Sequence, residues 1–139
     1  MMLPRLLLVF AAAAAAACGS TEPTVDPNTM SVVGTFQLES QKSVDPNGAF
    51  IPNNVPYVVY TSDQYTLGAD GSYARAWAGT FHLGAQSAPA TGAEQGTYQR
   101  NLSTLTFRGG AAFVATATIT TTGFEMRDSY FIYPFRRGP

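Results

Sequence analysis

The chain has 139 residues, which is enough for one domain but not for two domains of ordinary size. Charged residues make up 12 % of the chain and the formal net charge is −1, so we expect no nucleic-acid partner. Sixteen threonines and nine serines supply most of the polarity, and threonine in particular favours strands over helices.

An apolar run from Leu6 to Ala17 follows a short positive head that contains Arg5. Its twelve residues are fewer than the roughly 20 that a membrane-spanning helix needs, but they fit the apolar part of a secretory signal. The run lacks the polar face of an amphipathic helix in a folded domain. We therefore expect residues 1–17 to be a signal peptide and the protein to be exported.

Two types of cleavage fit the end of this run. Ala15 and Ala17 satisfy the Ala-x-Ala rule of ordinary signal peptidase. Residues 15–18, "AAAC", also resemble the lipobox of bacterial lipoproteins, and this resemblance implies that Cys18 is acylated. Cys18 is the only cysteine and cannot form an internal disulfide, whereas several acyl chains would anchor it firmly in a membrane. We favour the lipid anchor, and plain secretion stays the alternative.

Residues 18–30 are rich in proline, serine and threonine and show no apolar periodicity, which is typical of a flexible tether. Gly19, and not aspartate, follows the cysteine. In a bacterium with two membranes, the resemblance to lipoproteins then implies sorting to the outer membrane. We expect a cell-envelope protein whose partner is the membrane, reached through acylated Cys18.

From residue 31 onward the pattern has a period of two. The segment "GTFQLES" places Phe36 and Leu38 on one side, as expected for a half-buried strand. Turn residues dominate the next segment, including Asp45-Pro46-Asn47-Gly48, so we expect a loop over residues 41–56.

A β-hairpin is predicted over residues 57–81. Tyr65 and Leu67 share one face, and Asp70-Gly71 supplies residues that tolerate positive φ in a tight turn. The returning strand carries large side chains on one face and small ones on the other. The large face holds Tyr73, Arg75, Trp77 and Phe81, with Gly79 between the last two. A second loop is expected over residues 82–95.

Shorter strands are expected in the rest of the chain. Their expected inward positions are Tyr98, Leu105, Phe107, Ile119, Phe124, Met126, Phe131 and Tyr133. Phe113, Ala115 and Ala117 share a face with Ile119, and Phe135 alternates with Phe131 and Tyr133. Pro134 cannot donate a ladder hydrogen bond, so the last strand should end or lie on an edge there. About eight short strands without a helix predict an all-β fold, either a small antiparallel barrel or a sandwich.

Several segments in order resemble the small lipocalin-like domains of bacterial lipoproteins. They are "GTFQLES", a loop with "IP", "YTLGADGSY", "GTYQRNLSTLTF", "ATATIT" and "YFIYPFRR". The resemblance covers residues 31–137 and implies an up-and-down β-barrel. We therefore expect residues 31–139 to form one lipocalin-like barrel of about eight strands.

Catalytic chemistry has little support in the sequence. His82 is the only histidine, and no serine lies in the setting of a nucleophile. The acidic residues Asp63, Asp70, Glu94, Glu125 and Asp128 are scattered, mostly at predicted turns, and form no calcium-loop pattern. We expect a protein that is not an enzyme and that has no metal and no cofactor.

Arg75 is the most informative polar residue because it shares its face with aromatic rings. If this face is interior, the guanidinium must find an anionic partner in the protein or in a ligand. If the face is exterior, Arg75 stacks on the rings in solvent, and this commoner arrangement is the one we favour.

Two functions remain open. The first is binding of a small apolar or amphipathic ligand in the barrel mouth, with Tyr73, Arg75, Trp77 and Phe81 as the candidate lining. The second is a structural or inhibitor-like protein-interaction role, with a filled barrel and the loops at 41–56 and 82–95 as the surface. The presence of a cavity would separate the two.

Overall fold

The computed structural model describes residues 26–110 and 112–139. The expected signal peptide and the lipidation residue Cys18 lie outside the described residues. Across the described part of the chain the fold is all β, and it contains no helix that could span a membrane.

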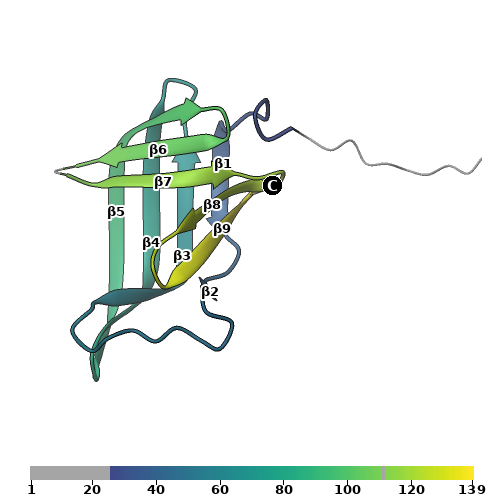
Figure 1. Ribbon diagram of the computed structural model, residues 1–139. Helices are drawn as coiled ribbons and strands as arrows, with labels where there is room; N and C mark the ends of the chain where they lie inside the picture. The colour runs from purple at the N-terminus through teal and green to yellow at the C-terminus, as the bar shows by residue number, and fades with distance from the viewer. Residues whose placement is uncertain (1–25, 111) are drawn as a thin grey trace, which may run out of the picture.

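Nine strands form one antiparallel sheet. They are β1 (Gly34–Leu38), β2 (Lys42–Ser43), β3 (Tyr57–Leu67), β4 (Ser72–Leu83), β5 (Gln86–Asn101), β6 (Thr104–Gly109), β7 (Val114–Ile119), β8 (Gly123–Arg127) and β9 (Phe131–Arg137). Their order is β1-β3-β4-β5-β6-β7-β8-β9-β2. Pairing of β1 with β9 closes an eight-stranded up-and-down barrel, and the short β2 adds to β9 beside it. The predicted all-β barrel is confirmed (Figure 1).

The barrel is uneven because three neighbouring strands are long. β3, β4 and β5 have 11, 12 and 16 residues, whereas β1, β6, β7, β8 and β9 have five to seven. Figure 1 shows the long strands running together and β6 and β7 at a steep angle to them. The long strands therefore extend beyond the part of the barrel that the short strands cover.

The predicted loop over residues 82–95 is wrong. β4 and β5 pair continuously from Ser72–Thr97 to Leu83–Gln86, and Gly84, at φ 58°, lies in the short turn between them. The segment resembles a loop in sequence because its alanines, glycines, serines and threonines carry no alternation of large apolar side chains. Hydrogen bonding along β4, and not burial of its side chains, holds this half of β5 in the sheet.

Pro134 lies inside β9, which continues to Arg137, so the strand does not end there. Its carbonyl accepts a hydrogen bond from the backbone N–H of Glu39 at 2.8 Å. The N–H and C=O of one strand residue point to the same side, so the missing N–H of Pro134 also faces this side. On this side β9 pairs with β1, which ends at Leu38, and with β2, which begins at Lys42. Pro134 faces the gap between these two strands, where a missing donor costs little.

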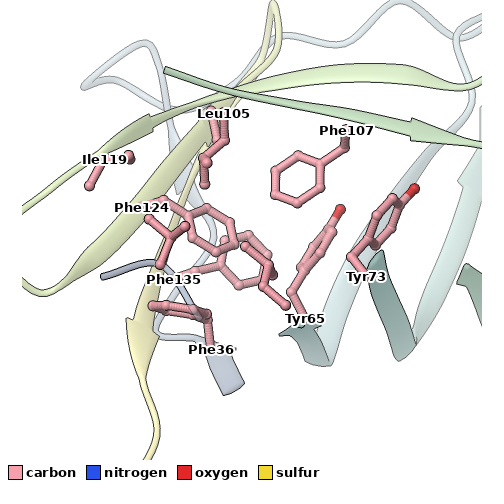
Figure 2. Close-up of a cluster of buried hydrophobic side chains, with 11 residues drawn as sticks. Phe36, Tyr65, Tyr73, Leu105, Phe107, Ile119, Phe124 and Phe135 are labelled. Carbon is pink, nitrogen blue, oxygen red and sulfur yellow. The ribbon is translucent and has the colours of Figure 1, made fainter. Parts of the chain in front are cut away.

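The core fills the end of the barrel near the β3–β4 turn. Six side chains are essentially inaccessible to solvent: Phe36, Tyr65, Leu67, Leu105, Phe107 and Phe124. The ring of Phe124 lies at the centre, 5.1 Å from Phe36, 5.7 Å from Phe107 and 4.9 Å from Phe135 between ring centroids (Figure 2). Interlocked rings from β1, β6, β8 and β9 thus close this end of the barrel.

The segment that precedes β1, residues 26–30, contacts the barrel. Asp26 and Met30 bracket a turn in which the N–H of Met30 donates to the carbonyl of Asp26. The guanidinium of Arg100, at the end of β5, donates to the carbonyls of Pro27 and Met30. The last five residues of the expected tether, 26–30, therefore form a turn attached to the barrel.

We predict that Phe124→Ala lowers the free energy of unfolding by about 3–5 kcal/mol, because it removes a ring that is 1 % exposed and leaves a cavity. Phe50→Ala is the matched control, since Phe50 is 85 % exposed, and it should change stability by no more than about 0.5 kcal/mol. Urea unfolding followed by the fluorescence of Trp77 measures both. Equal losses in the two variants would contradict this account of the core.

Candidate functional site

A cavity of about 400 Å³ lies next to the filled end of the barrel and is partly open to solvent. One wall comes from β3 and β4, and the opposite wall from β7, β8, β9 and the residues that flank them. The lining residues are Tyr60, Asp63, Tyr65, Arg75, Phe113, Val114, Ala115, Thr116, Met126, Arg127, Asp128, Tyr133 and Phe135. The barrel therefore has a packed end and a hollow end.

A buried ion pair forms the first wall. Arg75 donates from Nε to Oδ1 of Asp63 at 2.9 Å and from Nη2 to Oδ2 at 2.7 Å. The side chain of Arg75 is 13 % exposed and that of Asp63 1 %. Two parallel hydrogen bonds of this kind fix the orientation of the guanidinium as well as its position.

The strand register explains why these two residues meet. Arg75 lies opposite Tyr65 in the β3–β4 pair, and Trp77 lies opposite Asp63, so both charged side chains are on the inner face. A register shift between Tyr60 and Ser62 then returns Tyr60 to the inner face, out of simple alternation. As a result the Tyr60 hydroxyl accepts a hydrogen bond from Nη2 of Arg75 at 3.2 Å.

The guanidinium of Arg75 also packs on aromatic rings. Its Cζ lies 5.5 Å from the ring centroid of Tyr60 and 5.2 Å from that of Tyr65. Burial raises the pKa of Asp63 above its ordinary value, even though Arg75 places hydrogen bonds and a positive charge beside it. Arg75 therefore compensates only part of the cost of burying Asp63.

The exterior position favoured for Arg75 from the sequence is wrong. Arg75 faces the interior, and its anionic partner is Asp63 of the same chain. Sequence reasoning grouped Asp63 with the acidic residues at turns and so missed it. The signal was present, because a period of two from Leu67 through Tyr65 places Asp63 on the same face.

The other three candidate lining residues lie on the same face of β4 as Arg75, but none of them lines the cavity. Tyr73 is buried in the core, and its hydroxyl hydrogen-bonds Oε1 of Glu94 at 3.1 Å. Trp77 meets Tyr60 edge-on, at 5.6 Å between ring centroids. Phe81 lies near the far end of β4 and is 38 % exposed.

The opposite wall combines apolar side chains with one satisfied carboxylate. The Tyr133 hydroxyl donates to Oδ2 of Asp128 at 2.6 Å, and the backbone N–H groups of Tyr130 and Phe131 donate to Oδ1, both at 2.7 Å. Burial, together with Asp128, raises the pKa of Tyr133, so this phenol stays protonated. Met126 and Phe135 supply apolar surface beside it. Sequence reasoning did not select Tyr133 or Met126 as ligand-lining residues.

The only histidine of the chain, His82, lies away from the cavity. His82 stacks on the ring of Tyr57, with 4.9 Å between centroids, and does not line the cavity. Within residues 26–110 and 112–139, no three His, Cys, Asp or Glu side chains are grouped so that they could hold a metal ion.

Comparisons with protein-family models, with curated proteins and with solved structures find no match to this chain.

We predict that Asp63→Leu and Arg75→Met each lower the free energy of unfolding by about 3–5 kcal/mol, because each leaves a buried charge without its partner. The double variant should unfold with a free energy at least equal to that of the parent chain, since it removes both charges together. Urea unfolding of the four chains measures this. A double variant that is less stable than the parent chain would contradict this expectation and show that the pair stabilises the fold.

Proposed function

We propose that the protein binds a small amphipathic molecule in the cavity between β3–β4 and β7–β9, without chemical conversion. The observation that carries this proposal is the cavity itself, which measures about 400 Å³. Ligand pockets begin at roughly 300 Å³ and are commonly found in the mouths of barrels. The cavity is large enough for one small molecule and too small for a macromolecule.

The chemistry of the lining supports an amphipathic ligand. Phe113, Met126 and Phe135 offer apolar surface on one wall, and Arg75 with Tyr60 offers polar groups on the other. Few polar groups among apolar side chains are typical of a site that orients one end of its ligand. An eight-stranded barrel is also of the size that holds a single small ligand.

We further propose that this barrel is exported and lipid-anchored in the bacterial cell envelope, at the outer membrane where there is one. The support is the sequence pattern of residues 1–17 and the cysteine at position 18. The ordered segments that resemble lipocalin-like lipoproteins support the same assignment. A turn at residues 26–30, held by Arg100, then marks where the anchored segment meets the barrel.

A protein-interaction role is the alternative, and the open edge of β5 favours it. β6 pairs only with residues 96–101, so residues 86–95 have no further partner strand in the described part of the chain. The N–H of Tyr98 points to the β4 side, where it donates to Gly71. By alternation, the N–H groups of Thr91 and Ala93 point outward, where an extended segment of another protein could add to the sheet.

We predict that Ala115→Phe abolishes binding of the neutral apolar dye N-phenyl-1-naphthylamine, because Ala115 lines the cavity and the new ring would fill it. Thr118→Phe is the matched control, since Thr118 lies on the outer face of the same strand β7, and it should bind the dye as the parent chain does. Dye fluorescence titration measures both. Absence of dye binding to the parent chain would contradict the ligand-binding function and leave the interaction role.

We predict that Cys18→Ala moves the protein from the membrane fraction to the soluble fraction, because the acylated thiol is the proposed anchor. Ser20→Ala is the control, and it should leave the protein in the membrane fraction. Fractionation of cells followed by immunoblotting measures both. A Cys18→Ala chain that stays with the membrane would refute the lipid anchor and would not bear on the cavity.

A further inference from the structure

The two carboxylates that line the cavity already have hydrogen-bond partners within the protein. Both carboxylate oxygens of Asp63 already accept hydrogen bonds from Arg75. Asp128 already accepts two backbone N–H groups and the hydroxyl of Tyr133. The acceptors that line the cavity are thus largely used within the protein, and a ligand that needs acceptors finds few of them.

Arg75, which lines the cavity, keeps one nitrogen without a hydrogen-bond partner in the described part of the chain. A guanidinium has five N–H groups. Nε and Nη2 supply the bonds to Asp63 and Tyr60, whereas Nη1 has no hydrogen-bond partner among the described residues. In that part of the chain, the one buried side-chain polar atom without a partner is Oγ of Ser40, so Nη1 of Arg75 is not sealed in the protein interior.

Two further groups add to this donor set. The hydroxyl of Tyr60 accepts from Arg75 through its oxygen, so its own proton is free to donate. Arg127 lines the cavity and is exposed, and no carboxylate of the described residues forms an ion pair with it. The cavity therefore presents two guanidinium groups and a phenol to whatever enters it.

We propose that the ligand carries an anionic head group, such as a carboxylate, which binds Nη1 of Arg75. This inference rests on the proposed ligand-binding function and names the class of ligand. The head group accepts from Nη1 and from the Tyr60 hydroxyl, while Asp63 holds the guanidinium in place from its other side. Arg127 offsets the second negative charge that the ligand brings next to Asp63. The apolar tail lies along Phe113, Met126 and Phe135.

The ion pair of Arg75 and Asp63 favours an anionic ligand over a cationic one, because the carboxylate of the pair is already used. A cation would have to compete with Arg75 for Asp63, and with the Tyr133 hydroxyl and two backbone N–H groups for Asp128. A charge-assisted hydrogen bond to an anion is roughly twice as strong as one between neutral groups. We therefore expect decanoate to bind at least about tenfold more tightly than methyl decanoate, which has the same tail and no charge.

Displacement of N-phenyl-1-naphthylamine from the purified full chain tests this inference. The competitors are decanoate, methyl decanoate and decyltrimethylammonium, each used below its micelle concentration. Decanoate should displace the dye best, and decyltrimethylammonium least. In the Asp63→Leu/Arg75→Met chain, which keeps a neutral packed wall, the dye should still bind and the preference for decanoate should fall about tenfold or more.

Two further variants change exposed side chains, so they test the inference without disturbing the folded core. Arg127→Gln changes an exposed side chain and should weaken decanoate binding severalfold without changing that of methyl decanoate. Arg136→Gln is the control, because Arg136 is 60 % exposed and pairs with Glu39 away from the cavity, and its profile should match the parent. Equal affinities for decanoate and methyl decanoate in the parent chain would overturn the anionic head group while the ligand-binding function stands. Failure of the dye and of every competitor to bind would overturn both.

Discussion

The ion pair between Asp63 and Arg75 lies where the packed core of the barrel ends and the cavity begins, and this boundary determines the rest of the interior. On one side of it, aromatic rings fill the lumen completely, and on the other the lumen is open. A buried pair of charges cannot be covered by apolar side chains without satisfying its remaining donors. The packed core therefore stops at Tyr65, and Arg75, which keeps one nitrogen without a hydrogen-bond partner among the described residues, lines the cavity beyond it. The same pair that limits the core thus creates the polar end of the cavity.

The uneven strand lengths have a related effect. β3, β4 and β5 extend beyond the short strands, so the wall that carries Arg75 continues past the opposite wall. This leaves the cavity open at one end, and it also leaves residues 86–95 of β5 paired with β4 alone among the described strands. Pro89 lies on that open edge, where a missing N–H is tolerated and where it discourages uncontrolled strand addition. The ligand site and the interaction edge therefore share one cause.

The sequence predicted the barrel well because several core strands alternate large apolar and polar residues, as β1, β6 and β8 do. It failed where order comes from backbone pairing alone, as in the first half of β5. It also placed Arg75 on the wrong face, because a period of two says which residues share a face and not which face is interior. Tyr60 was beyond sequence reasoning, since its inward position follows from a register shift in β3 that no local pattern reveals.

Trp77 shows why a large ring on the inner face does not close the cavity. Its cross-strand partner in β5 is Gly92, and a Cβ added to Gly92 would lie 2.4 Å from the indole. The indole therefore lies directly over the backbone of β5, a position that only glycine allows. At Gly96, opposite Tyr73, an added Cβ would lie 2.1 Å from the carbonyl oxygen of Arg108 and 2.8 Å from the Tyr73 ring. Because these glycines let the rings lie against the sheet, the lumen beside Arg75 stays free, and the volume of the cavity depends on residues that do not line it.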